Sequence, residues 1–114
     1  MLTIKRVYEI PTLADGYRVL VDRLWPRGLT KERAAVDCWL KAIAPSSELR
    51  QWFNHDAAKF DEFAARYTSE LAQNSSLPTM RELIAKHPSL TLIYAAKDPR
   101  INHAAVLKDF LVKK

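Results

Sequence analysis

Cysteine and glycine are scarce in this chain of 114 residues, which contains one cysteine and two glycines. The single cysteine, Cys38, excludes a disulfide within the chain and is typical of a reducing compartment, so we expect a cytoplasmic protein. Because Gly16 and Gly28 are the only glycines, neither a dinucleotide-binding fingerprint nor a Walker-type phosphate loop is present. A phosphatase loop that starts at Cys38 would need arginine six residues later, where the chain has Ala44.

Long hydrophobic runs and clustered metal ligands are also absent. No apolar stretch approaches the roughly 18 residues that a membrane-spanning helix needs, and the first residues are typical of a strand, so we expect no signal peptide and no membrane association. His55, His87 and His103 are far apart and lack the spacing of a metal site. We therefore expect neither a metal nor another cofactor.

What the chain does contain is an uneven distribution of positive charge. The net charge is +5, from 18 basic and 13 acidic residues. Residues 1–33 hold seven basic and four acidic residues, residues 34–74 hold four and six, and residues 75–114 hold seven and three. The two ends could form one basic face for an anionic partner, or the asymmetry could be an ordinary feature of a solvated surface.

The pattern of apolar residues predicts an α/β fold in a single domain over residues 1–114. Strand-like segments cover residues 3–10, 17–24 and 90–96, the last two with consecutive apolar residues as in buried strands. Helical patterns cover residues 30–43, a short segment after Ser46, residues 56–71, residues 78–87 and a segment that Asp98 and Pro99 begin. We expect a small, at least partly parallel sheet flanked by helices in a three-layer-like arrangement.

The neighbours of the first strand stay open at this point. Asp15-Gly16 is a strong turn signal, but a loop of about six residues is too short for a helical crossover between parallel neighbours. The strands at residues 3–10 and 17–24 therefore either form a hairpin or are not adjacent. For the core we expect Val19, Leu20, Val21, Leu92 and Ile93, with Phe60, Phe63, Tyr67 and Leu71 packed on them or on neighbouring helices.

The strands 17–24 and 90–96 end in the same way, with an apolar run followed by charged residues and a helix. Ligands of open α/β sheets bind outside the carboxyl ends of the strands. If these two strands are adjacent and parallel, one edge of the sheet gathers a set of polar side chains that we call the strand-end cluster: Asp22, Arg23, Trp25, Arg27, Lys97, Asn102 and His103. Its arginines and the nearby helix N-termini favour an anionic ligand, either phosphate or carboxylate.

Each member of the strand-end cluster also has an alternative, purely structural interpretation. Arg23 could form an ion pair with Asp22 or Asp98, and Trp25 could cover the core. His103 is the candidate catalytic residue, because a histidine can act as a general acid or base near neutral pH, but it could equally be hydrogen-bonded within the fold.

Long motifs spread over nearly the whole chain connect it with a known family. They are IKRVY (4–8), DGYRVLVDRLWPRG (15–28), APSSELR (44–50), WF (52–53), FAARYTSEL (63–71), TLIYAAKD (91–98) and NHA (102–104). Together they closely resemble the short bacterial YeaO-like proteins, domain-of-unknown-function family 488. The resemblance implies no assigned activity. Longer relatives have a segment with cysteine and histidine near the end, and here Tyr94 and Asn102 stand where cysteines are expected, which argues against cysteine-based or metal-based chemistry in this chain.

Three functions compete on this basis, and we expect them in the following order. The first is a small enzyme or sensor that binds an anionic metabolite at the strand-end cluster. The second is a nucleic-acid-binding module with Tyr17 and Trp25 as stacking groups, for which we expect at most weak and unspecific binding. The third is a structural or partner-binding domain whose arginines are ion-paired. Arginines gathered in a hollow favour the first, exposed aromatics among basic side chains the second, and paired, buried arginines the third.

Overall fold

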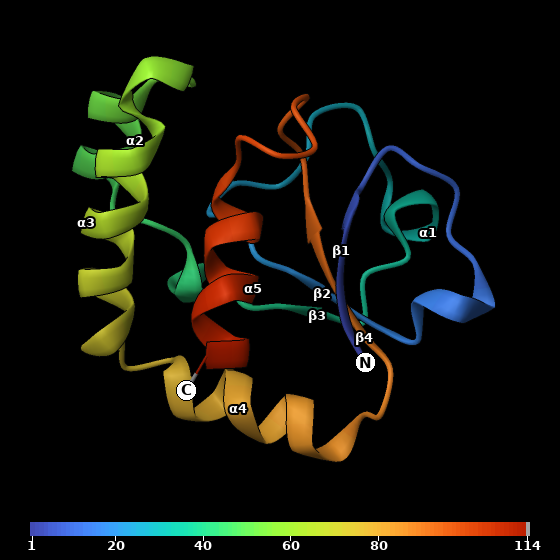
Figure 1. Cartoon of the computed structure of the whole chain (residues 1–114). Helices are drawn as coiled ribbons and strands as arrows, with labels where there is room; N and C mark the ends of the chain where they lie inside the picture. The colour runs from blue at the N-terminus through green and yellow to red at the C-terminus, as the bar shows by residue number, and fades with distance from the viewer. Residues whose placement is uncertain (114) are drawn as a thin grey trace.

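A computed structural model, which describes residues 1–113, has one parallel sheet of four strands within these residues (Figure 1). The strands are β1 (Leu2–Arg6), β2 (Tyr17–Leu20), β3 (Cys38–Trp39) and β4 (Leu90–Tyr94), and their order in the sheet is β1-β4-β2-β3. All three strand pairs are parallel, which confirms the predicted α/β fold.

Strand β4 lies between β1 and β2, and every one of its five residues is buried, as its nearly all-apolar sequence predicts. Its residue Leu92 is in register with Ile4 of β1 on one side and with Val19 of β2 on the other. The first strand and β2 are therefore separated by β4, and of the two open alternatives the hairpin is wrong. The predicted parallel pairing of the second and last strands is confirmed.

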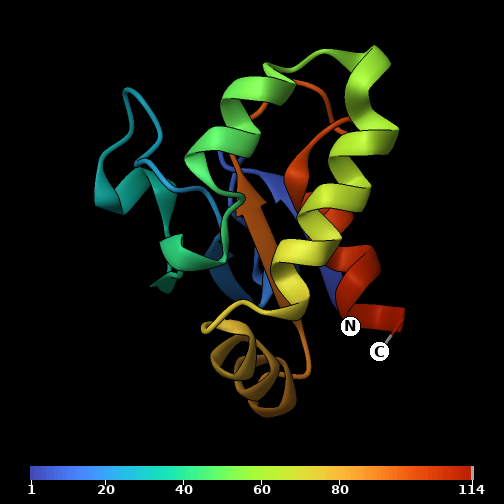
Figure 2. The same cartoon turned by 90° about the vertical axis from the view of Figure 1, so that its left-hand side faces the viewer.

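Helices lie on both faces of the sheet, as Figures 1 and 2 show. One face carries α2 (Ser47–Phe53), α3 (Phe60–Ala72), α4 (Leu77–Lys86) and α5 (His103–Lys113). The other face carries only the short α1 (Lys31–Ala34) and the loops around it. No helix among residues 1–113 is long and apolar enough to cross a membrane.

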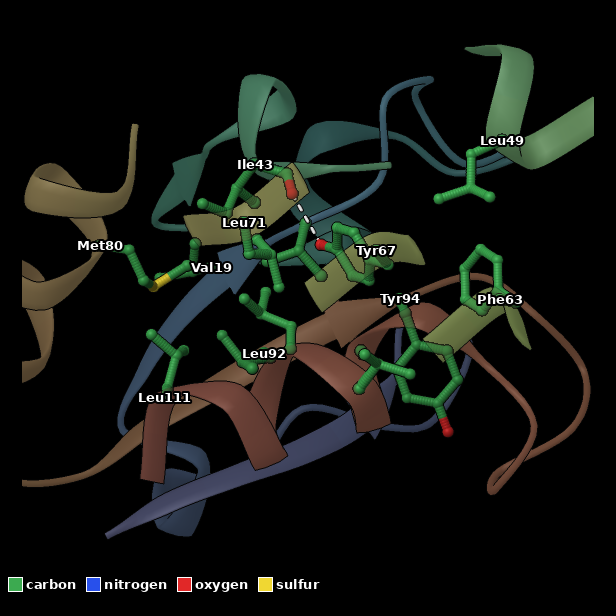
Figure 3. Close-up of a cluster of buried hydrophobic side chains, with 14 of the residues drawn as sticks. Val19, Ile43, Leu49, Phe63, Tyr67, Leu71, Met80, Leu92, Tyr94 and Leu111 are labelled. Atoms are coloured by element: carbon green, nitrogen blue, oxygen red, sulfur yellow. Dashed lines mark hydrogen bonds between the residues drawn. The ribbon is translucent and has the colours of Figure 1, made fainter. Parts of the chain in front are cut away.

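The larger core lies between the sheet and helices α2 to α5, and Figure 3 shows part of it. Five predicted strand positions are fully buried: Val19, Leu20, Val21, Leu92 and Ile93. Phe63, Tyr67 and Leu71 of α3 are buried as well, at the spacing of one helix face, whereas Phe60 is only partly covered. The predicted core is therefore confirmed, with Phe60 at its margin.

The helix expected over residues 30–43 is wrong. Thr30 does cap a helix, but α1 ends after one turn because Ala35 adopts a left-handed conformation with φ of 50°. The chain then forms β3, in which Cys38 pairs with Val19, and a 3₁₀ turn over Lys41–Ile43. The apolar residues have helical spacing, but pairing with the open edge of β2 decides the conformation of this segment. Cys38 is therefore a half-buried strand residue rather than a helical one.

The predicted start of the last helix is also wrong. Oδ1 of Asp98 accepts hydrogen bonds from the backbone N–H groups of Arg100 and Ile101, at 2.8 and 3.0 Å, and so closes a separate turn. The cap of α5 is Asn102, whose Oδ1 accepts from the N–H of Ala105 at 2.8 Å. His103 is therefore the first residue of α5.

A buried ionic network stabilises the turn that precedes β2. Asp15 is only 7 % exposed and contacts two cations, Arg18 Nη1 at 2.6 Å and Lys5 Nζ at 3.0 Å. Desolvation by burial would raise the pKa of Asp15, but hydrogen bonds from Thr12, Lys5 and Arg18 outweigh it and lower the pKa to about 2. This aspartate thus stays ionised in the folded state and fixes the turn that precedes β2.

Candidate functional site

The carboxyl ends of β2 and β4 meet at one edge of the sheet, which lies at the top of Figure 1. Beyond the end of β2 the N–H of Val21 still donates to the carbonyl of Ile93 at 3.0 Å, so the two chains leave the sheet together. Oδ2 of Asp22 then accepts from the N–H of Ala95 at 3.2 Å. Asp22 therefore ties the loop after β2 to the loop after β4.

His103 reaches the same place from the start of α5. Its Nε2 lies 3.1 Å from the carbonyl oxygen of Val21 and 3.1 Å from Oδ1 of Asp22. Both side chains are largely buried, with 15 % and 18 % of their surface exposed. The hydrogen bond of Nε2 goes to Val21, and Oδ1 of Asp22 forms no aligned hydrogen bond within residues 1–113. Two of the predicted site residues are thus brought together.

Arg23 is engaged with the backbone of the chain itself. Its Nη2 donates to the carbonyls of Ala44 and Pro45, both at 3.2 Å, and its Nε lies 3.4 Å from the carbonyl of Pro45. These carbonyls lead directly into α2, whose cap Ser46 is held in turn by the carboxylate of Glu70 on α3. Arg23 therefore fastens the start of α2 to the sheet edge.

Two tryptophans pack edge to face beside Asp22. The indole N–H of Trp25 donates to the carbonyl of Leu29 at 2.8 Å, and that of Trp39 donates to the carbonyl of Asp22 at 2.8 Å. Their ring centroids are 5.5 Å apart in a T-shaped arrangement. Trp25 is half-buried and covers the smaller core, whereas Trp39 is 37 % exposed and lies under the ammonium group of Lys41 at 4.8 Å.

The remaining members of the strand-end cluster do not converge on Asp22 and His103. Arg27 and Lys97 are exposed, and within residues 1–113 neither side chain forms a hydrogen bond. Asn102 is buried as the cap of α5, and its Nδ2 donates to the carbonyl of Asp98 at 2.8 Å. The structure therefore divides the predicted site into a buried part and two exposed cations.

Tyr67 is a neighbour of the site that the sequence did not indicate. Its hydroxyl donates to the carbonyl of Ile43 at 2.6 Å, as Figure 3 shows, and its ring meets that of His103 at 6.3 Å. Burial raises the pKa of Tyr67 strongly, and the negative charges of Glu70 and Asp22 add to this rise. A tyrosine in the apolar stripe of a helix predicts only that its ring is buried in the core. Nothing in the sequence pattern predicts the hydrogen bond of its hydroxyl.

The candidate catalytic residue His103 is present in the buried part, where it contacts Asp22 and Val21. Asp22 and His103 form an acid–histidine pair, but no cysteine or serine lies next to it among the contacts of residues 1–113. Tyr94 is 2 % exposed, and burial raises its pKa, so its hydroxyl stays protonated. No group of three or more histidine, cysteine or acidic side chains in the described part of the chain could hold a metal ion.

Two hollows on the surface lie away from the buried part. One, of about 250 Å³, is lined by residues of the loop after β1 and by Leu29, Glu32 and Arg33. The other, of about 710 Å³, is a groove between α3 and α5. Neither is lined by Asp22, Arg23 or His103.

Comparison with known proteins identifies a family model and several similar proteins. The family model described as "Inactive DUF488-N3 subclade" matches residues 1–114. The "Uncharacterized protein YeaO" of Escherichia coli K12 is 48 % identical over 107 residues, which cover 94 % of this chain and 93 % of the relative. The "Uncharacterized protein Rv3073c" of Mycobacterium tuberculosis H37Rv is 44 % identical over 108 residues, 95 % of this chain and 91 % of the relative. No solved structure matches the chain significantly.

Proposed function

Because the chain belongs to the DUF488 family, in the subclade described as inactive, we propose that it is a non-catalytic, partner-binding domain whose strand-end cluster stabilises the fold. Of the three functions that the sequence leaves open, this is the one that arginines bonded within the fold favour, although Arg23 bonds backbone carbonyls and forms no ion pair with Asp22 or Asp98 within residues 1–113. It assigns Asp22, His103 and Arg23 to holding loops and helices together, not to binding a substrate.

One observation carries this proposal, namely the hydrogen bonds that the Arg23 side chain donates within the fold. An arginine that binds phosphate or carboxylate presents two parallel N–H groups to the anion. Here Nε and Nη2 already donate to the carbonyls of Ala44 and Pro45, which would otherwise be left unpaired near the start of α2. Arg18, the other arginine of the β2 segment, likewise donates its side-chain hydrogen bonds to Asp15 and to two backbone carbonyls.

Binding of a small anion near Arg23 remains the second candidate function. Nη1 of Arg23 forms no hydrogen bond within residues 1–113, and Arg27 and Lys97 are exposed at the same edge of the sheet. These groups could together hold a phosphate or carboxylate group. The carboxylate of Asp22 next to Arg23 would oppose such binding by charge repulsion.

The two candidates are separated by thermal unfolding at matched ionic strength, with inorganic phosphate as the probe and chloride as the reference. For a structural Arg23, we expect Arg23→Ala to lower the melting temperature by the same amount with and without phosphate. The exposed Arg33 provides the matched control, because Arg33→Ala removes the same charge from α1 without breaking a side-chain hydrogen bond. Saturable stabilisation of the unaltered chain by phosphate, lost in Arg23→Ala and kept in Arg33→Ala, would establish the anion site instead.

A further inference from the structure

The groove between α3 and α5 is the larger of the two hollows, and no member of the strand-end cluster lines it. The two helices pack side by side, as Figures 1 and 2 show. Its lining includes Phe60 and Ala64 of α3 and Ala105, Asp109 and Phe110 of α5, with Arg100 just before α5. Small alanines and two phenylalanines make up most of its apolar part.

Two oppositely charged side chains of the groove have no partner of their own. Arg100 stands just before α5 and Asp109 lies in the middle of that helix, and both are exposed. A third charged side chain of the lining, Lys113, is exposed at the end of α5. Neither Arg100 nor Asp109 forms an ion pair or a side-chain hydrogen bond within residues 1–113. Phe110, by contrast, is held in place by the guanidinium group of Arg81 on α4, 5.8 Å from the ring centroid. The charged pair is therefore available for contacts outside the chain.

We propose that this groove binds the same groove of a second copy of the chain, in a symmetric dimer. Arg100 lies before the first turn of α5, and Asp109 lies further along the same helix. In a two-fold symmetric pair with the α5 helices antiparallel and crossing near Ala105, Arg100 of each copy therefore lies on the side of Asp109 of the other copy. Both ion pairs form at once because a two-fold interface uses the same surface twice.

The small side chain of Ala105 suits this arrangement, because two helices approach most closely where their side chains are small. The apolar lining that is still partly exposed includes Phe60 of α3 and Phe110 of α5. Burial of these rings supplies the attraction, and the two ion pairs select the antiparallel orientation. The proposal goes beyond the non-catalytic function and does not depend on the strand-end cluster.

The experiment measures the molar mass of the chain in solution, by sedimentation or light scattering, over a range of about 1–200 μM. We expect the unaltered chain to reach twice its monomer mass of 13.1 kDa. The single reversals Arg100→Asp and Asp109→Arg each place like charges opposite one another, so each should raise the dissociation constant at least about tenfold. The double variant with both reversals restores opposite charges and should bring the dimer back.

Controls make the result specific to the groove. Arg33→Asp changes the charge by the same amount on the other face of the sheet and should leave dimerisation unchanged, and far-ultraviolet circular dichroism should show that all variants fold. A chain that stays monomeric at 200 μM overturns the proposal. It is also overturned if the unaltered chain dimerises and the single reversals have no effect, since the interface would then lie elsewhere, or if the double variant stays monomeric.

Discussion

Nε2 of His103 lies 3.1 Å from Oδ1 of Asp22, so the first residue of α5 meets the loop after β2 although β3, β4 and four helices separate them in the sequence. The same nitrogen bonds the carbonyl of Val21 at 3.1 Å. This contact holds the start of α5 against the edge of the sheet. It also determines which ring nitrogen of the histidine carries the proton.

Both oxygens near Nε2 are acceptors, so we expect neutral His103 to carry its hydrogen on Nε2. Ring nitrogen chemical shifts measured by nuclear magnetic resonance report the tautomer directly. His55, which is exposed and forms no side-chain hydrogen bond within residues 1–113, serves as the reference in the same spectrum. A hydrogen on Nδ1 of His103 would contradict the contact with Val21 and Asp22.

Phe63 should be the most sensitive aromatic position of α3. It is 1 % exposed and stacks on Phe53 with ring centroids 4.1 Å apart, so Phe63→Ala leaves a cavity in the larger core. We expect a loss of about 3–5 kcal/mol in the free energy of unfolding, measured with urea. Phe60→Ala removes the same side chain at the margin of the core and should cost clearly less. A loss below about 1 kcal/mol for Phe63→Ala would show that this face of α3 does not bury the ring.

The free energy of unfolding should depend on the ionisation of Asp15. Its pKa in the folded chain is about 2, below the unfolded value near 4, so the stabilisation is present above pH 4 and is lost as the pH falls towards 2. Protonation of Asp15 therefore lowers the free energy of unfolding by about 2 kcal/mol between pH 5 and pH 2. Asp15→Asn should remove that part of the pH dependence, whereas Asp61→Asn on the exposed side of α3 should keep it. An unchanged acid titration in Asp15→Asn would contradict the buried network.

The two glycines provide a matched pair for a substitution by alanine. Gly16 has φ of 65°, and a Cβ there would lie 2.2 Å from the carbonyl oxygen of Ser89, so Gly16→Ala forces the backbone apart. Gly28 has φ of 80°, but a Cβ there would meet no atom within 4 Å, so Gly28→Ala costs only the left-handed conformation, about 1 kcal/mol. We expect Gly16→Ala to cost at least about 3 kcal/mol in urea unfolding. Equal losses for the two variants would contradict the close approach at Ser89.

Much of the fold follows from the sequence because its apolar segments are strongly patterned. The nearly all-apolar run in β4 predicts the central strand, and the helical stripe of Phe63, Tyr67 and Leu71 predicts the main core helix. Strand β3 could not be predicted, because Cys38 and Trp39 join the sheet only through the free edge of β2. A two-residue strand carries no periodicity of its own, and its partner lies far away in the sequence.

The candidate site was predictable only in part, for a similar reason. Asp22 follows from its place after β2 and His103 from the helix that follows β4, and they do meet. The partners of Arg23 are backbone carbonyls of Ala44 and Pro45, and any residue has such carbonyls, so no residue type marks them. The expected stacking groups differ as well, since Tyr17 lies against His87 with ring centroids 3.8 Å apart at the far end of β2.

Nucleic-acid binding stays a prediction, and we expect it to be weak and unspecific. The exposed cations are spread over several elements, and of the two predicted stacking groups Tyr17 is already covered by His87. Any affinity would depend on phosphate contacts and should fall steeply between about 50 and 200 mM salt. Fluorescence anisotropy with labelled single-stranded DNA checks this, with an unrelated sequence of equal length as control. Tight, sequence-dependent binding near physiological salt would instead favour the nucleic-acid-binding module.

The central position of β4 has a consequence for how the chain folds during synthesis. This strand forms the hydrogen bonds of both β1 and β2, yet it is the last strand to leave the ribosome. Until residues 90–94 emerge, β1 has no partner in the sheet, and its edge and that of β2 are open to other chains. Closing such distant pairs late makes folding slow relative to helical proteins of this size, and it leaves both strand edges exposed to aggregation until residues 90–94 have emerged.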